Sequence, residues 1–199
     1  KDPTNHPVPQ EQVNDILVER AKRGLTVVRL KGGDPYVFGR GGEEVHACRT
    51  AGVDVTVVPG ISSALSVPAL AGIPVTQRGV ATSVHITSGH AGADAAALAA
   101  LAAGSTLVIL MGVSALPRIC EAAVAHGVRP DLPVAIVEDG STPRQRVTRA
   151  TLATAAQVAA TSTVRAPAIV VVGAVAAPGF LDDPVCGTSW PGKEVADVQ

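Results

Sequence analysis

The most promising chemistry in this sequence lies in a glycine-rich stretch, residues 31–42. Its first part, Lys31-Gly-Gly-Asp-Pro35, follows an apolar run typical of a buried strand. It would therefore form a loop at the carboxyl end of a strand, where open α/β sheets bind ligands. Two glycines let the backbone approach a ligand closely, and Asp34 can accept a hydrogen bond from a hydroxyl or ammonium group. A tight turn ending at Asp-Pro is an equally good interpretation. The spacing is neither Gly-x-Gly-x-x-Gly nor a Walker loop, so it does not indicate a nucleotide phosphate site.

Three further corners between expected strands and helices carry polar groups. Residues 39–42 (GRGG) present the cation of Arg40, residues 59–63 (PGISS) bring two hydroxyls near exposed helix N–H groups, and residues 138–141 (EDGS) follow another strand. Taken singly, each corner suits a plain helix entry or cap. Their recurrence favours a small-molecule site, because several loops at one edge of a sheet can enclose a ligand.

Other kinds of site lack their signatures. The five histidines show no metal-ligand spacing, the three cysteines include no Cys-x-x-Cys pair, and no Gly-x-Ser-x-Gly motif occurs, so neither a metal nor a hydrolase is indicated. Aromatic residues make up 2% of the chain and the formal net charge is −1, which argues against binding of single-stranded nucleic acid. Scattered cysteines suit a reducing cytoplasm, and no apolar run reaches the roughly 18 residues of a membrane span. We therefore expect a cytoplasmic protein with neither nucleic acid nor membrane as a partner.

The elements that would position these loops alternate between helix and strand along the chain. Hydrophobic residues make up 47% of the sequence and charged residues 17%, and a core of Val, Ala, Leu and Ile suits parallel strands covered by Ala-rich helices. The periodicity predicts helices at residues 10–23, 43–52, 62–71, 94–103, 114–126 and 152–160. Strands are expected at residues 25–30, 53–58, 83–87, 106–110, 134–137, 146–149 and 168–172. We expect an α/β fold with parallel-rich sheets in two domains, residues 1–80 and 81–177, and an irregular tail at 178–199.

One long run, residues 27–44, reads VVRLKGGDPYVFGRGGEE and strongly resembles the tetrapyrrole methylase family. The resemblance continues through VPQEQVNDIL, VVPGISSA, AGIPVTQRGVA, SVHITSGH, LVILMG, PVAIVEDGSTPRQR and PAIVVVG, and so covers nearly the whole chain up to Gly173. Within the family, the continuation Phe-Gly-Arg-Gly-Gly-Glu-Glu is similar to the uroporphyrinogen-III C-methyltransferases. Relatives that act on later corrinoids, diphthine or ribosomal RNA differ there.

The resemblance implies two α/β domains with S-adenosyl-L-methionine bound in the cleft between them, usually in a homodimer and with no metal. The residues expected by motif to contact this cofactor are Gly32, Gly33, Asp34, Val37, Ser62, Ser63, Met111, Gly140 and Ala168. The tetrapyrrole substrate carries several carboxylates, so a locally cationic cleft is expected despite the near-neutral net charge. The candidates for it, each of which also suits a plain surface role, are Arg40, Arg78, Arg144 and Arg146.

The implied reaction transfers two methyl groups to C2 and C7 of uroporphyrinogen III. It gives precorrin-2 and S-adenosyl-L-homocysteine, at the entry to sirohaem and cobalamin synthesis. The family's proposed acid is a Lys that precedes the Pro-Gln pair, which here is Lys1 before Pro9-Gln10. The sequence departs from the family at residues 2–5, which read Asp-Pro-Thr-Asn in place of Lys-Arg-Ala-Gly, and at Gln77, which replaces a usual His. The family's first strand, its Gly-Pro-Gly-Asp loop and an Asp base would lie before Lys1, so we expect the chain to be part of a longer protein.

Three other functions fit some of the same residues. An NAD-dependent oxidoreductase shares the alternation of helix and strand, but it would need a dinucleotide fingerprint that the chain does not show. A methyltransferase acting on a later precorrin would share the family motifs. A non-catalytic S-adenosyl-L-methionine-binding protein would keep the cofactor residues, and binding without turnover would identify it.

Overall fold

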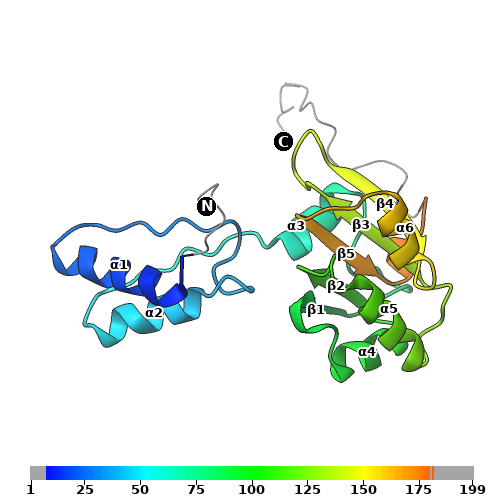
Figure 1. Cartoon of the computed structure of the whole chain (residues 1–199), viewed down its shortest axis with the longest axis horizontal. Helices are drawn as coiled ribbons and strands as arrows, with labels where there is room; N and C mark the ends of the chain where they lie inside the picture. The colour runs from blue at the N-terminus through cyan, green and yellow to red at the C-terminus, as the bar shows by residue number, and fades with distance from the viewer. Residues whose placement is uncertain (1–7, 180, 182–199) are drawn as a thin grey trace, which may run out of the picture. The chain divides into compact units, whose positions relative to one another are not determined.

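The computed structural model describes residues 8–179 and residue 181. The chain forms two compact units, Lys1–Ser62 and Ser63–Gln199 (Figure 1). Residues 63–80, which the sequence pattern placed in the first domain, belong to the second unit. Val67 and Ile73 are buried in a core cluster with residues of the sheet, so the division between units falls after Ser62 and not after residue 80.

The first unit is built on two helices that contact each other, α1 (Gln10–Lys22) and α2 (Gly41–Thr50). The sequence predicted both. α1 begins directly after Pro9, whose carbonyl accepts a hydrogen bond from the Val13 amide at 3.2 Å. α2 carries two glutamates in its first turn, where carboxylates complement the helix dipole.

The two strands expected in this unit, at residues 25–30 and 53–58, are not formed. Within residues 8–62 the structure contains no strand, and both segments are irregular. Together with α1 and α2 they line a cavity of about 850 Å³, and Val28, Leu30 and Val58 are 82%, 83% and 77% exposed. The prediction was wrong because an apolar run forms a strand only where a neighbouring backbone can pair with it. Among the described residues of this unit, neither segment is paired in this way.

The second unit contains a five-stranded sheet of order β1-β2-β5-β3-β4. Its strands, all expected from the sequence, are β1 (Val84–Ser88), β2 (Thr106–Leu110), β3 (Pro133–Glu138), β4 (Arg146–Thr151) and β5 (Ala168–Val172). β1 and β2 are parallel, whereas β5 is antiparallel to β2 and β3, and β3 is antiparallel to β4. The expectation of a parallel-rich sheet was therefore wrong. Only residues 139–145 join β3 to β4, and a connection that short closes a hairpin but cannot carry a parallel crossover.

Helices cover both faces of this sheet (Figure 1). They are α3 (Ser63–Leu70), α4 (Ala95–Ala102), α5 (Leu116–Ala125) and α6 (Ala155–Thr161), with short 3₁₀ turns η1 (Gly89–Ala91) and η2 (Ala174–Ala176). Because successive strand residues point to opposite faces, Leu107 and Ile109 pack with α4, α5 and α6, while Val108 and Leu110 lie in the cluster that contains α3 and η2. The loops at the ends of the strands therefore rest on a well-packed base.

Candidate functional site

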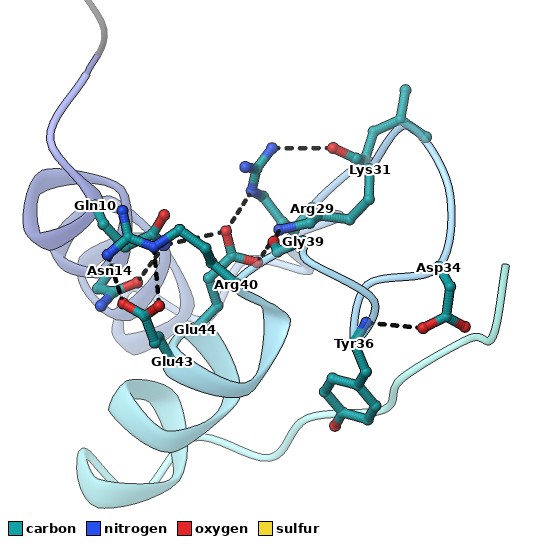
Figure 2. A network of polar contacts seen from close by, with 11 residues as sticks. Gln10, Asn14, Arg29, Lys31, Asp34, Tyr36, Gly39, Arg40, Glu43 and Glu44 are labelled. Carbon is teal, nitrogen blue, oxygen red and sulfur yellow. Dashed lines mark hydrogen bonds and ion pairs between the residues drawn. The ribbon is translucent and has the colours of Figure 1, made fainter. Parts of the chain in front are cut away.

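The glycine loop, defined here as residues 31–40, is held to the corner at Gly60 by one side chain. Asp34 accepts a hydrogen bond from the Tyr36 amide at 2.8 Å on one oxygen and from the Gly60 amide at 3.2 Å on the other. Figure 2 shows the first of these bonds. A Cβ atom at Gly60 would lie 2.5 Å from the Gly33 carbonyl oxygen, so only glycine permits this close approach of the two loops. Gly33 and Asp34, both predicted from the sequence, lie at this junction.

A buried carboxylate, Glu44, stands beside the loop. Glu44 is 5% exposed and accepts hydrogen bonds from Gln10 at 3.2 Å, Arg29 at 3.1 Å and Lys31 at 2.8 Å (Figure 2). Burial raises the pKa of Glu44, but hydrogen bonds from Lys31, Gln10 and Arg29 outweigh this and leave the pKa below its ordinary value. The sequence suggested only a helix-dipole role for this residue. The pattern that could have predicted its burial is Arg29-Leu-Lys31. Two cations at alternate positions of an apolar run indicate an acidic partner nearby.

The remaining predicted cofactor residues of the first unit are close to these. Gly32 is exposed in the loop, and the Val37 amide donates to the Asp34 carbonyl at 3.4 Å. Ser62, which is 9% exposed, ends the unit, and Ser63 is the first residue of α3 in the second unit.

In the second unit, the predicted cofactor residues meet at one edge of the sheet. The register aligns Ala168, the first residue of β5, with Glu138, the last residue of β3, and places the next residue of β5 opposite the last residue of β2. Because β5 is antiparallel to both neighbours, its start lies beside their carboxyl ends. Met111 follows β2 and Gly140 lies in the turn after β3. The sheet topology thus brings together Met111, Gly140 and Ala168, which are far apart in the sequence.

Backbone strain is concentrated in the same loops. The described non-glycine residues with positive φ, between 46° and 66°, are Phe38, Arg40, Met111, Asp139, Ser141 and Thr163. All but Thr163, which follows α6, lie in corners where the sequence predicted the site. A left-handed backbone costs such residues on the order of 1–3 kcal/mol, so it persists where the surroundings fix it, and it clusters at functional sites.

The arginines expected to bind substrate are exposed, but most already have an acidic partner. The Nη2 atom of Arg40 lies 2.7 Å from Oε2 of Glu43, and the Nε atom of Arg144 lies 3.4 Å from Oδ2 of Asp139. Arg78 is exposed on the segment before β1. Of these three, Arg78 and Arg144 are the best placed to contact a substrate. The Arg144 side chain is 76% exposed, and its single ion pair is long and so contributes little.

The fourth candidate, Arg146, has a structural partner. It donates two hydrogen bonds, at 2.7 and 2.8 Å, to the carboxylate of Glu138, which is 7% exposed and also accepts from the Arg165 amide at 2.9 Å. Burial raises the pKa of Glu138, but the bonds from Arg146 and the Arg165 amide outweigh it, so the pKa lies below the ordinary value. Arg146 therefore ties β4 to β3 at the sheet edge.

Two predicted features fall on residues that the structure does not describe. Lys1 and nearly all of the tail at residues 178–199 lie outside the described residues. Within the described part of the chain, no three His, Cys, Asp or Glu side chains gather as metal ligands would. None of the helices there is both long and apolar enough to span a bilayer.

Glycine-rich loops, corners with positive φ and sheet edges that gather backbone groups are typical of α/β proteins that bind small molecules. Residues 1–156 match the family model of the Tetrapyrrole (Corrin/Porphyrin) Methylases, and the chain belongs to this family. The resemblance found in the sequence is thereby confirmed.

Individual relatives support the same placement. An "S-adenosyl-L-methionine-dependent uroporphyrinogen III methyltransferase" of Methanosarcina barkeri is 49% identical over 178 residues, covering 86% of this chain and 69% of that protein. A siroheme synthase of Methylobacillus flagellatus is 46% identical over 173 residues, covering 85% of this chain and 37% of that protein. The uroporphyrin-III C-methyl transferase from Thermus thermophilus, solved with S-adenyl homocysteine, is 40% identical with a TM-score of 0.70, covering 83% of this chain and 74% of that one. This chain therefore spans 69% of the first relative's length and 37% of the second's.

Proposed function

We propose that this protein transfers methyl groups from S-adenosyl-L-methionine to C2 and C7 of uroporphyrinogen III, giving precorrin-2 for sirohaem synthesis. One observation carries the proposal: a relative described as this methyltransferase is 49% identical in a match that covers 86% of the chain. The glycine loop and the sheet edge support it physically, because they supply the groups that such a cofactor needs.

The glycine loop suits the amino-acid and ribose parts of the cofactor. Each oxygen of Asp34 accepts one backbone hydrogen bond, and each has a second lone pair for a cofactor hydroxyl or ammonium group. No protein atom outside its immediate neighbours lies within 4 Å of the position that a Cβ of Gly32 would occupy, so this backbone is open to a ligand. Asp34 and Gly32 are therefore the first-choice contacts.

The sheet edge of the second unit suits the adenine ring. Met111, Gly140 and Ala168 present backbone groups at the ends of three adjacent strands, and backbone N–H and C=O groups can recognise a base without charged side chains. The strained φ of Met111, 54°, fits a role in which the loop geometry is fixed before the ligand binds.

The cofactor supplies an electrophilic sulfonium methyl group, which an electron-rich pyrrole carbon can attack without an enzyme nucleophile. The chain's task is then to bind and orient, and proximity of this kind contributes on the order of 7–11 kcal/mol to a bimolecular step. Arg78 and Arg144 are exposed cations suited to the substrate carboxylates, and Lys1 is the proposed proton donor. We also propose a homodimer, a cytoplasmic location, chemistry without a metal and a supply of precorrin-2 to cobalamin synthesis, as the family resemblance implies.

The test is a calorimetric titration of the full-length protein with S-adenosyl-L-methionine and S-adenosyl-L-homocysteine. Uroporphyrinogen III is then added anaerobically, and methylation is followed by mass and absorbance. Two methyl additions are expected. Asp34→Asn should weaken cofactor binding about 10- to 100-fold, the equivalent of one lost hydrogen bond to a charged group.

Asp15→Asn, at an exposed position of α1, is the matched control and should bind as the wild type does. Binding without methylation would indicate a different tetrapyrrole substrate or a non-catalytic protein. No binding would overturn the proposal.

A further inference from the structure

Two glutamates occupy the first turn of α2, and the structure treats them differently. The side chain of Glu43 is 52% exposed and pairs with Arg40, whereas Glu44 is 5% exposed. The Glu44 amide donates to the Arg40 carbonyl at 3.3 Å, so the helix itself fixes where this carboxylate lies. Burying a carboxylate costs free energy unless it is paired and hydrogen-bonded, so the partners of Glu44 are what allow it to be buried.

The partners of Glu44 come from two separate segments, α1 and the stretch that leads into the glycine loop (Figure 2). One oxygen accepts from Gln10 on α1 and from Arg29 in the apolar run, and the other accepts from Lys31 at the start of the glycine loop. The ion pair with Lys31, at 2.8 Å, is the shortest of the three contacts, and the Lys31 side chain is only 15% exposed. Glu44 is therefore the common point at which α1, α2 and the loop are joined.

Lys31 passes this constraint on to the glycine loop. Its ammonium group also donates a hydrogen bond to the Gly39 carbonyl, so it bridges the start and the end of the loop. Within the loop, Asp34 accepts from the Tyr36 amide, and the Pro35 carbonyl accepts from the amide of Gly41, two residues beyond Gly39, at 2.9 Å. The segment that carries Gly32, Gly33 and Asp34 is thus closed by one lysine, and that lysine is oriented by Glu44.

We propose that Glu44, acting through Lys31, is a positioning residue that sets the geometry of the glycine loop and so determines how tightly the loop binds its ligand. The inference rests on the proposed function, in which that ligand is S-adenosyl-L-methionine. In this role Glu44 acts through its protein partners and not by direct contact with the cofactor. Without Glu44, the Lys31 ammonium group would be unpaired in a largely buried position and would move toward solvent. The hydrogen bond from Lys31 to the Gly39 carbonyl would then be lost, and the loop would no longer be held.

The test compares three variants of the full-length protein. Glu44→Gln removes the charge and replaces one acceptor oxygen with an NH2 donor; because Lys31 bonds one oxygen of Glu44 and Arg29 bonds the other, one of these two cations then faces a donor. Lys31→Met removes both the bond to Gly39 and the ion pair with Glu44, and it keeps an unbranched side chain and the pairing of Glu44 with Arg29. Glu19→Gln, which removes an exposed ion pair with Arg23 on α1, is the matched control for the lost charge.

The first readout is the Kd for S-adenosyl-L-homocysteine. Glu44→Gln and Lys31→Met are each expected to raise it about 10- to 100-fold, the range that misplacement of a binding group by about an ångström can cause. Because both act through one link, the double variant should be no worse than the worse single variant. Additive effects, or a wild-type Kd in a folded Glu44→Gln, would overturn the inference.

The second readout is amide hydrogen exchange at residues 31–41 in the protein without ligand. The Gly41 amide should exchange faster in Lys31→Met and Glu44→Gln than in Glu19→Gln, while α1 stays protected. This readout separates the two hypotheses. If the wild type fails to bind S-adenosyl-L-homocysteine, the proposed function fails, but faster loop exchange still supports the Glu44–Lys31 link; unchanged exchange in both variants overturns that link whatever the ligand.

Discussion

At the scale of single residues, two acidic side chains shape the first unit in different ways. Asp34 joins two backbone corners while keeping lone pairs for a ligand, and Glu44 is buried among three donors. Gly60 makes the first arrangement possible, because the backbone of the neighbouring loop lies where a side chain would start. The identity of a residue here decides how closely two loops can approach.

We predict that Gly60→Ala abolishes tight binding of S-adenosyl-L-homocysteine and lowers the free energy of unfolding by about 1–3 kcal/mol, a typical cost of overpacking. The added Cβ would lie 2.5 Å from the Gly33 carbonyl oxygen and 3.1 Å from the Asp34 amide nitrogen. Calorimetry and urea unfolding measure the two effects.

Gly42→Ala is the control for this change. Apart from its chain neighbours and the backbone of its own helix, no protein atom lies within 4 Å of the Cβ position at Gly42, and the residue is in α2, where alanine is favoured over glycine by about 1 kcal/mol. This variant should bind the ligand normally and be slightly more stable. If the two alanine variants behave alike, the close approach of the loops does not matter for binding.

At the scale of elements, the sheet edge depends on a contact between neighbouring strands. β3 ends at Glu138 and β4 begins at Arg146, directly opposite it in the register. Two hydrogen bonds from Arg146 to Glu138 close the turn that carries Asp139 and Gly140. The Arg165 amide, in the segment before β5, donates a third bond to the same carboxylate. The carboxylate therefore fixes three strands at the point where the cofactor is proposed to bind.

We predict that stability gained from Glu138 depends on pH. Because the folded-state pKa of Glu138 is lowered, its contribution is fully present above the unfolded-state pKa of about 4.3 and is lost as the pH falls through the lower folded-state value. The difference in free energy of unfolding between wild type and Glu138→Gln should thus shrink between pH 6 and the acid limit of folding. Urea unfolding across that range measures it.

Glu121→Gln, at an exposed position of α5, controls for the loss of one negative charge. Its stability relative to wild type should change less with pH than that of Glu138→Gln. A Glu138→Gln difference that is constant with pH would show that the ion pair with Arg146 contributes nothing through its charge.

At the scale of the whole molecule, the predicted cofactor residues are divided between two units. Gly32, Gly33 and Asp34 belong to the first, and Met111, Gly140 and Ala168 belong to the second. The first unit has irregular segments beside a cavity of about 850 Å³, and the second has a well-packed sheet. We therefore expect the second unit to open less readily than the first, because buried apolar contacts protect a segment from local unfolding.

We predict that saturating S-adenosyl-L-homocysteine slows amide exchange in both units at once, at residues 31–41 and at residues 111–112 and 139–141. Mass spectrometry of deuterium uptake measures this. α6 and α4, which carry none of the predicted cofactor residues, are the internal controls and should change little. Unchanged exchange at residues 31–41, or at residues 111–112 and 139–141, would contradict the proposed cofactor contacts of those residues.

Much of the local structure could be predicted from residue patterns alone. Short apolar runs located all five strands of the second unit, and helical periodicity located α1 to α6. Glycine, proline and aspartate at strand ends identified the glycine loop and the corners at Gly60 and Gly140. Residues 27–44 identified the family, since no structure is needed to match so long a run.

Only the tertiary structure decided which of these elements pair and which charges meet. The runs at residues 25–30 and 53–58 are rich in valine and leucine, as the strands of the second unit are, yet they form no strand, because a strand also needs a paired backbone from elsewhere in the chain. In the same way, the sequence could not show that Glu44 is buried against Lys31 or that Arg146 is held by Glu138. Local pattern fixes what a segment can do, whereas burial and pairing depend on contacts between residues far apart in sequence, and those exist only once the chain has folded.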